Sequence, residues 1–234
     1  MKTSTVIICL LASLCFTSCR STKPGSPAKA APSFPSDYQG RPFADSMYHS
    51  GPQVIPGRLE CAYFDLGGEG VAYHDQDAIN HGSGELNLKP DHQRPHATPY
   101  IWGFRADEGM DISYTKDFAD FNHPNFFTPA TNQLYVGWTA DGEWCNYTVN
   151  VKRAGTYKIT ALYGNAANRI WFDVDNKPTV ACKLPLATGS MHIWNKAEIG
   201  TIAFAKPGLH LLTFHYNAGN NFAYFDFEYL DRKY

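Results

Sequence analysis

The stretch "VGWTADGEWCNYTVNVKRAGTYKITALY", residues 136–163, decides the fold class of this chain. After the polar turn Thr139 to Gly142, apolar and polar residues alternate with the two-residue period of a strand that has one face in a core. An Ala-Gly turn at 154–155 follows, and the alternation resumes. The inward-facing residues of the two runs are Cys145, Tyr147, Val149 and Val151, and then Tyr157, Ile159, Ala161 and Tyr163. The stretch therefore predicts two antiparallel strands joined by a short turn.

The same pattern continues to the C-terminus and, less regularly, toward the N-terminus. Short β-rich segments separated by turn residues predict an all-β protein, an antiparallel β-sandwich of the jelly-roll type. Residues 80–99 are rich in Gly, His and Pro and predict a long loop, which in a compact domain is functional or mobile. The further strands expected lie at 58–64, 71–74, 110–114, 170–175, 179–184, 198–205, 209–216 and 222–230.

The first residues carry the pattern of an export signal. Val6 to Phe16 form an apolar run that is too short to span a bilayer, and small residues and Cys19 follow it. This segment resembles the lipobox of bacterial lipoproteins, in which the Cys becomes the lipid-modified first residue. The resemblance implies a signal peptide over residues 1–18 and an exported lipoprotein at the outer membrane or cell surface. An ordinary signal peptide cut nearby is the alternative.

Composition divides the remaining chain in two. Prolines recur among Ser, Ala and Lys up to residue 57, and such a segment predicts a tether over 19–57 that has too little apolar material to fold. From Arg58 onward the chain predicts one domain, 58–234, with a sizeable core. The balance of 20 basic and 22 acidic residues gives a formal net charge of −2 and argues against a nucleic-acid partner.

Three cysteines follow Cys19, and their odd number allows at most one disulfide plus one free thiol. Each lies at the apolar parity of its expected strand, so a role as a small buried hydrophobic residue is equally open. They are Cys61, Cys145 and Cys182.

Five blocks of the sequence carry a family pattern. They are "RLECAYFDLGGEGVAYHD" at 58–75, "EGMDISY" at 108–114, the stretch 136–163, "LPLATGSMHIW" at 184–194 and "GNNFAYFDFEY" at 219–229. In this order they resemble carbohydrate-binding module family 6. The resemblance implies a β-jelly roll that binds a polysaccharide or oligosaccharide, often as the companion of an enzyme such as a glycoside hydrolase.

The resemblance also implies a binding cleft in the loops at one edge of the sandwich. Trp138 matches an aromatic residue that stacks on a sugar ring, whereas Met191 stands where a second aromatic residue is expected. Glu69 matches an acid of the early Gly-rich loop. Asn220 and Asn221 loosely match an Asn that bonds sugar hydroxyls.

Physical chemistry supports an exposed Trp at the turn. Sugars present apolar C–H faces ringed by hydroxyls, so a binding site needs an aromatic plate with planar polar groups around it. The alternative for Trp138 is a residue that closes the sandwich. His192 and Tyr73 are further candidate ligand-binding residues, and Trp102 either extends the cleft or fixes the long loop to the domain. Trp171 lies at the outward parity of its strand, and Trp194 is expected in the core.

No metal or other cofactor is predicted. Ala62 and Phe225 stand where the family's structural calcium would have carboxylates, and a hard cation needs six or more oxygen ligands. No catalysis is predicted either. The candidate acid pairs are Asp226 with Glu228 and Asp141 with Glu143. Such acids are ordinary at the outward-facing positions of any half-exposed sheet. The alternatives are a small glycoside hydrolase or lyase that uses such carboxylates, or a structural adhesion module.

Overall fold

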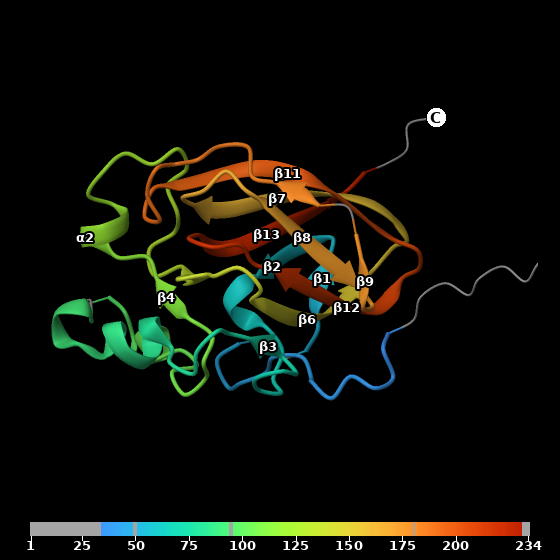
Figure 1. The fold of residues 1–234 in the computed structure, drawn as a ribbon, viewed down its shortest axis with the longest axis horizontal. Helices are drawn as coiled ribbons and strands as arrows, with labels where there is room; N and C mark the ends of the chain where they lie inside the picture. Colours follow the sequence, from blue (N-terminus) through green and yellow to red (C-terminus); the bar gives the residue numbers. More distant parts are fainter. Residues whose placement is uncertain (1–33, 49–50, 94–95, 180, 231–234) are drawn as a thin grey trace, which may run out of the picture. The chain divides into compact units, whose positions relative to one another are not determined.

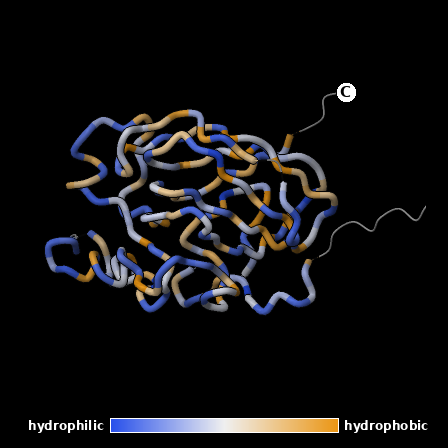
Figure 2. The backbone as a smooth tube through the Cα atoms, in the orientation of Figure 1, coloured by the Kyte–Doolittle hydropathy of each residue, from blue (hydrophilic) through white to orange (hydrophobic). Residues whose placement is uncertain are grey.

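Two β-sheets form the folded part of the chain and pack face to face (Figure 1). The computed structural model describes residues 34–48, 51–93, 96–179 and 181–230, so the predicted signal peptide and Cys19 lie outside the described residues. Hydrophobic and hydrophilic residues alternate along the strands, as a sandwich with one core requires (Figure 2). Among the described residues, no helix is long and apolar enough to cross a membrane.

The first sheet has the strand order β1-β6-β12-β8-β10, with β3 paired to β6 and β9 to β8. All pairs are antiparallel except that of β1 with β6. Its strands are β1 (Gln53–Ile55), β3 (Tyr73–His74), β6 (Trp144–Val151), β8 (Arg169–Val174), β9 (Lys177–Pro178), β10 (Cys182–Lys183) and β12 (Gly208–His215).

The second sheet has the order β11-β7-β13-β5-β4, with β2 also paired to β13, and is antiparallel throughout. Its strands are β2 (Gly57–Glu60), β4 (Ile112–Tyr114), β5 (Leu134–Val136), β7 (Gly155–Gly164), β11 (Trp194–Phe204) and β13 (Asn221–Tyr229). The predicted antiparallel β-sandwich is therefore confirmed.

The core lies between the sheets, where the predicted alternation places it. The inward residues of β6 are at most 1% exposed. Between the layers, Phe172 and Phe214 stack on each other, and Phe225 meets both rings edge to face. Cys61, Cys145 and Cys182 are free and buried, so they act as small hydrophobic residues and form no disulfide. A smaller cluster that contains Tyr135 and Trp194 lies apart from this core.

The predicted tether extends too far along the chain. Residues 34–57 belong to the same compact unit as the sandwich. β1 pairs with β6, Phe43 is only 5% exposed, and the hydroxyl of Tyr38 donates to Asp65 Oδ2 at 2.9 Å. The proline count misled the prediction, because the aromatic and β-branched residues between the prolines have enough apolar surface to dock. The domain boundary at Arg58 is therefore wrong for residues 34–57.

The strand predicted over 58–64 is also shorter than expected. Cys61–Tyr63 form a 3-10 helix, η1, directly after β2. The side chain of Gln53 accepts from the Glu60 amide at 2.8 Å and donates to the carbonyls of Glu60 and Tyr63. A side chain thus satisfies main-chain groups that a neighbouring strand would otherwise bond.

The loop predicted over 80–99 is a series of short turns fixed to the sandwich. Asn80 is buried, and its Oδ1 accepts from the amides of Gly82, Ser83 and Ile112. The turns are the π-helix η2 (His81–Glu85) and the 3-10 helices η3 (Leu86–Leu88) and η4 (Pro90–His92), followed by the α-helix α1 (Pro99–Trp102). A second short helix, α2, spans Asp117–Asp120.

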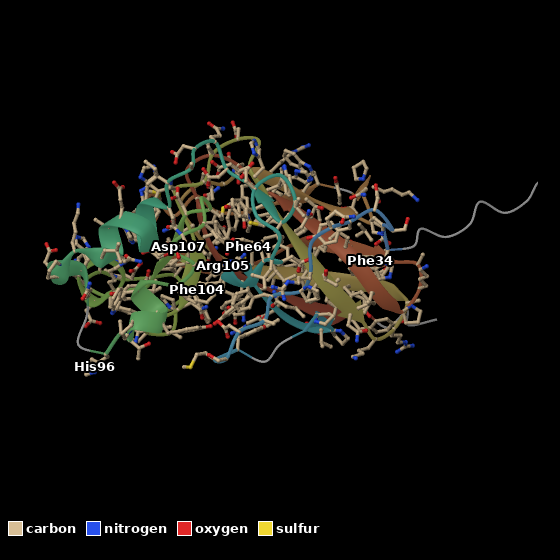
Figure 3. The ribbon with its side chains drawn as sticks, turned by 90° about the horizontal axis from the view of Figure 1, so that it is seen from below. Phe34, Phe64, His96, Phe104, Arg105 and Asp107 are labelled. Carbon is tan, nitrogen blue, oxygen red and sulfur yellow. The ribbon has the colours of Figure 1, made fainter. Side chains whose placement is uncertain are left out.

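Arg105 fixes the segment after α1. Its guanidinium lies 3.4 Å from the centre of the Phe64 ring, pairs with Glu108 at 2.7 Å and donates to the carbonyl of Asp65 at 2.8 Å (Figure 3). A buried Arg satisfied in this way holds residues 103–111 against the sandwich.

Candidate functional site

The turn between β5 and β6, residues 137–143, presents Trp138 to solvent. Trp138 is 37% exposed and has a left-handed backbone with φ of 50°. That conformation is unusual for a bulky residue and persists only where the surrounding structure enforces it. The aromatic plate predicted from the sequence is thus accessible, although binding by it stays a prediction.

Hydrogen bonds enforce this conformation from three sides. The amide of Gly137 donates to the carbonyl of Asp111 at 3.1 Å, and the amide of Ala140 donates to Glu143 Oε2 at 2.8 Å. Thr139 Oγ1 donates to the carbonyl of Asn217 at 2.7 Å. The turn is therefore preorganised by the loop before β4, by its own acid and by the loop before β13.

Met191 and Asn221 lie next to this turn. A Cβ atom on Gly137 would approach Asn221 Oδ1 to 2.7 Å, so only glycine fits there. Asn221 Nδ2 in turn donates to the carbonyl of Met191 at 2.9 Å. Met191 is 37% exposed. The structure therefore brings together Trp138, Asn221 and Met191, which are far apart in the sequence.

Asn220 is a structural residue. It is fully buried, its Oδ1 accepts from the amide of Ala166 at 2.7 Å, and its Nδ2 donates to Asn217 at 2.9 Å. These bonds tie two loops of the cluster together and leave Asn221 as the Asn that lies beside the turn.

Three other sequence candidates are engaged in the fold. Tyr73 is 5% exposed, and its hydroxyl accepts from the Gly109 amide at 2.8 Å. Trp102 is partly buried against the core, as its packing alternative predicts. His192 Nδ1 lies 3.0 Å from Asp120 Oδ1, and that oxygen also accepts from Trp194 Nε1 at 2.7 Å.

Glu69 lies in a separate acidic pocket near the turn. Its Oε2 accepts from the amide of Asp75 at 3.1 Å, and its Oε1 lies 2.5 Å from His74 Nδ1. The pocket has a volume of about 470 Å³. Its lining includes Glu69, Tyr73, Asp75, Gln76, Asp77 and Asp107.

Three buried acids lie at or behind this pocket, and no pattern in the sequence indicates their burial. Asp75, Asp111 and Glu143 are 7%, 4% and 4% exposed. Burial raises the pKa of Asp111 and of Glu143 to about 7, and it raises the pKa of Asp75 as well. Repulsion adds to each increase: Asp75 acts on Asp111 and on Glu143, whereas Asp77 and Glu69 act on Asp75. Only the tertiary fold shows that these loop acids converge.

An aromatic row crosses the outer face of the first sheet. Trp144 pairs in register with His74 on β3 and with His215 on β12, and His215 pairs with Trp171 on β8. Trp171 and His215 stack with ring centres 5.1 Å apart, and Trp171 is 38% exposed. Four adjacent strands place these rings along roughly 14 Å. The sequence of any one strand does not predict this row, because the row depends on the register in which the neighbouring strands pair.

The family model of "Carbohydrate binding module (family 6)" matches residues 113–231. The chain belongs to carbohydrate-binding module family 6. The matched residues include the turn of Trp138, the Met191 loop and all of β13, so they contain most of the loop cluster described above. The members of this family are carbohydrate-binding, non-catalytic modules.

Several solved structures are similar to this module. One, a family 6 module whose binding sub-sites were dissected by crystallography and calorimetry, is 12% identical with a TM-score of 0.46, covering 76% of this chain and 98% of that chain. A module from Clostridium stercorarium in complex with cellobiose is 12% identical with a TM-score of 0.43, covering 77% and 98%. A β-1,3-glucan-binding module from Bacillus halodurans is 13% identical with a TM-score of 0.42, covering 76% and 98%. No curated protein matches the chain.

The family's calcium position does not fit a cation in this module. Ala62 and Phe225 are both fully buried and apolar, so neither side chain provides an oxygen ligand. Among the residues that the structure describes, no three His, Cys, Asp or Glu side chains are grouped to hold a metal ion. The absence of a cofactor stays a prediction.

The acid pairs considered for catalysis lie in different surroundings. Asp226 pairs with Arg58 at 2.8 Å and with Lys196 at 2.7 Å, and Glu228 pairs with Lys158 at 2.5 Å. These ion pairs lower the pKa of Asp226, which suits a surface charge rather than a proton donor. Glu143 differs from the expected outward acid because it is buried and closes the turn.

Proposed function

We propose that this module binds a polysaccharide or oligosaccharide without catalysis, and that the turn of Trp138 provides the main platform. The observation that supports this is an exposed Trp held in a left-handed conformation by hydrogen bonds to two other loops and to the turn's own Glu143. A fold has no structural need for an exposed Trp at that cost, whereas a sugar face needs a rigid aromatic plate.

The polar groups around the platform suit a carbohydrate. Asn221 is 3% exposed and its Oδ1 lies beside Gly137 of the turn, and Met191 offers a flexible apolar side chain where a second ring is absent. Met adapts its shape to a partner but has no flat face. We therefore expect a sugar held between one aromatic plate and a softer apolar wall.

The aromatic row of His74, Trp144, His215 and Trp171 supports a second contact surface for the same kind of ligand. Its length of roughly 14 Å matches an extended stretch of chain rather than a single sugar unit. The first surface lies in loops that connect the two sheets and the second on the outer face of the first sheet, so each can be tested alone.

Affinity electrophoresis against a panel of soluble polysaccharides tests this function. Retardation by one glycan should be lost in Trp138→Ala, with a cost of about 1–3 kcal/mol, and kept in Trp171→Ala if the turn is the main site. Loss in Trp171→Ala alone would move the main site to the row. Retardation by no glycan, together with a co-purifying protein, would favour the adhesion alternative, and release of reducing ends would favour the glycoside hydrolase or lyase alternative.

We also propose that the protein is an exported lipoprotein anchored through Cys19 at the outer membrane or cell surface, where it holds glycan for capture or for a partner glycoside hydrolase. The sequence pattern at the N-terminus supports this. In a bacterial host, Cys19→Ser should abolish metabolic incorporation of a labelled fatty acid and release the protein from the membrane fraction. Unchanged fractionation would contradict the anchor.

A further inference from the structure

The acidic pocket beside the turn has an imbalance of charge. Its described lining contains four carboxylate residues and no lysine or arginine. Asp111 and Glu143 add two more acids behind Asp75. The nearby basic side chains already contact other acids: His74 contacts Glu69, His81 contacts Asp77 and Glu85, and Arg105 pairs with Glu108.

Asp75 is the residue that points to a ligand. Its side chain lines the pocket and is more than nine-tenths buried, and Oδ1 accepts from the Asp77 amide at 3.0 Å. Oδ2 is buried and has no hydrogen-bond partner among the residues that the structure describes, although the nearby Asp111 amide lowers the pKa of this carboxyl. A buried carboxylate oxygen without a donor is costly, so a donor supplied from outside the chain would stabilise it.

The chemistry of the missing donor follows from the site. A cation is favoured by the surrounding acids, and the described residues provide no group of three ligands positioned for a metal ion. An ammonium group does not need three ligands around one point, because it carries three hydrogen-bond donors that can reach separate acceptors. The pocket volume of about 470 Å³ lies within the range of small-molecule sites.

Hydrogen bonds link the pocket and the acids behind it to the turn that carries Trp138. Gln76 Nε2 donates to the carbonyl of Asp141 at 2.7 Å, and the amide of Gly137 bonds the carbonyl of Asp111. Binding there requires that a glycan stacked at Trp138 extends a neighbouring unit or a substituent into the pocket. We propose that the pocket binds the free ammonium group of an amino sugar, with Asp75 as its direct acceptor. This inference rests on the proposed function and names its ligand class.

Calorimetric titration of the purified protein with oligomers of glucosamine tests the inference, with N-acetylglucosamine oligomers of equal length as the uncharged control. At pH 6 we expect the glucosamine oligomer to bind at least tenfold more tightly. Binding should release protons, because an ammonium group favours the ionised form of the buried acids. Titrations in two buffers of different ionisation enthalpy measure that release, which the control oligomer should not cause.

Variants assign the effect to the pocket. Asp75→Asn should abolish the preference for the amine, and Glu198→Gln, which removes an exposed acid on β11, should keep it. Asp107→Asn changes an exposed residue of the lining and provides the test if Asp75→Asn fails to fold. Trp138→Ala should weaken both oligomers alike.

Three results would overturn the inference. They are equal affinity for the two oligomers, a preference that survives both pocket variants, and a calcium-dependent rise in melting temperature that Asp75→Asn removes. Binding of neutral glycans without an amine preference would overturn this inference alone. Binding of no glycan at all would overturn the proposed function as well.

Discussion

Glu143 Oε2 accepts a hydrogen bond of 2.8 Å from the amide of Ala140, three residues earlier in the chain. Oε1 of the same side chain lies 3.4 Å from the amide of Gln76, which donates to it. One buried acid therefore closes the turn that presents Trp138 and joins it to the acidic pocket. We therefore expect the protonation of this acid to affect both the stability of the domain and the geometry of the platform.

Stability should fall as the pH rises from about 5 to about 8. The pKa values of Asp111 and Glu143 are raised by burial to about 7, so the folded state binds more protons than the unfolded state between about pH 4 and pH 7. The pKa of Asp226 is lowered, so its contribution is present above about pH 4 and lost in stronger acid. We expect a maximum near pH 5 and a melting temperature roughly 10 °C or more lower at pH 8, because each of the two acids loses about 2–3 kcal/mol of stabilisation over this range.

In the variant Glu143→Gln, the melting temperature should depend less on pH, because the glutamine side chain does not ionise. Calorimetric scans of both proteins at four pH values measure the effect, and Glu198→Gln on the exposed face of β11 is the matched control. A melting temperature that rises steadily from pH 5 to pH 8 in the original protein would contradict the raised pKa values.

Asp120 should be essential for the loop that carries Met191. It is fully buried and accepts from Trp194 Nε1, from the Lys116 amide at 2.7 Å and, through His192, from the loop itself. Asp120→Ala should cost about 3 kcal/mol, because it leaves buried donors without an acceptor. Thermal unfolding should show a fall of roughly 6–12 °C, whereas the exposed Asp117→Ala in the same helix should change little. Equal effects of the two variants would argue against this role.

The segment before β2 should be required for a stable domain. Asp65 is buried and accepts from the Tyr38 hydroxyl, from the Thr148 amide at 2.8 Å and from Thr148 Oγ1 at 2.6 Å. A protein that begins at residue 58 loses β1 and the buried ring of Phe43, and it should unfold at a much lower temperature than one that begins at residue 34. Equal melting temperatures would show that residues 34–57 are a dispensable tether.

The cysteines should be unreactive in the folded protein. All three in the described domain are free and buried, and burial raises the pKa of each thiol. Because the thiolate is the reactive form, a colorimetric thiol reagent should label none of them in native protein from residue 20 onward, and all three in denaturant. Rapid labelling without denaturant would contradict the packing around them.

The sequence alone determined the local elements of the sandwich. The alternation in β6, β7, β12 and β13 follows from the strand period of two, which is a property of neighbouring residues and needs no knowledge of partners. The exposure of Trp138 was also predictable, because a polar turn follows it directly. Burial of the cysteines followed from the same alternation.

Only the tertiary structure decided which residues share a site. Asp75, Asp111 and Glu143 meet because three loops converge, and no local pattern reports a contact between residues so far apart in sequence. The row of His74, Trp144, His215 and Trp171 depends on strand register, which pairing across the sheet sets. Residues 34–57 gain their order from the surface they cover, so their proline-rich composition described the isolated segment and not the docked one.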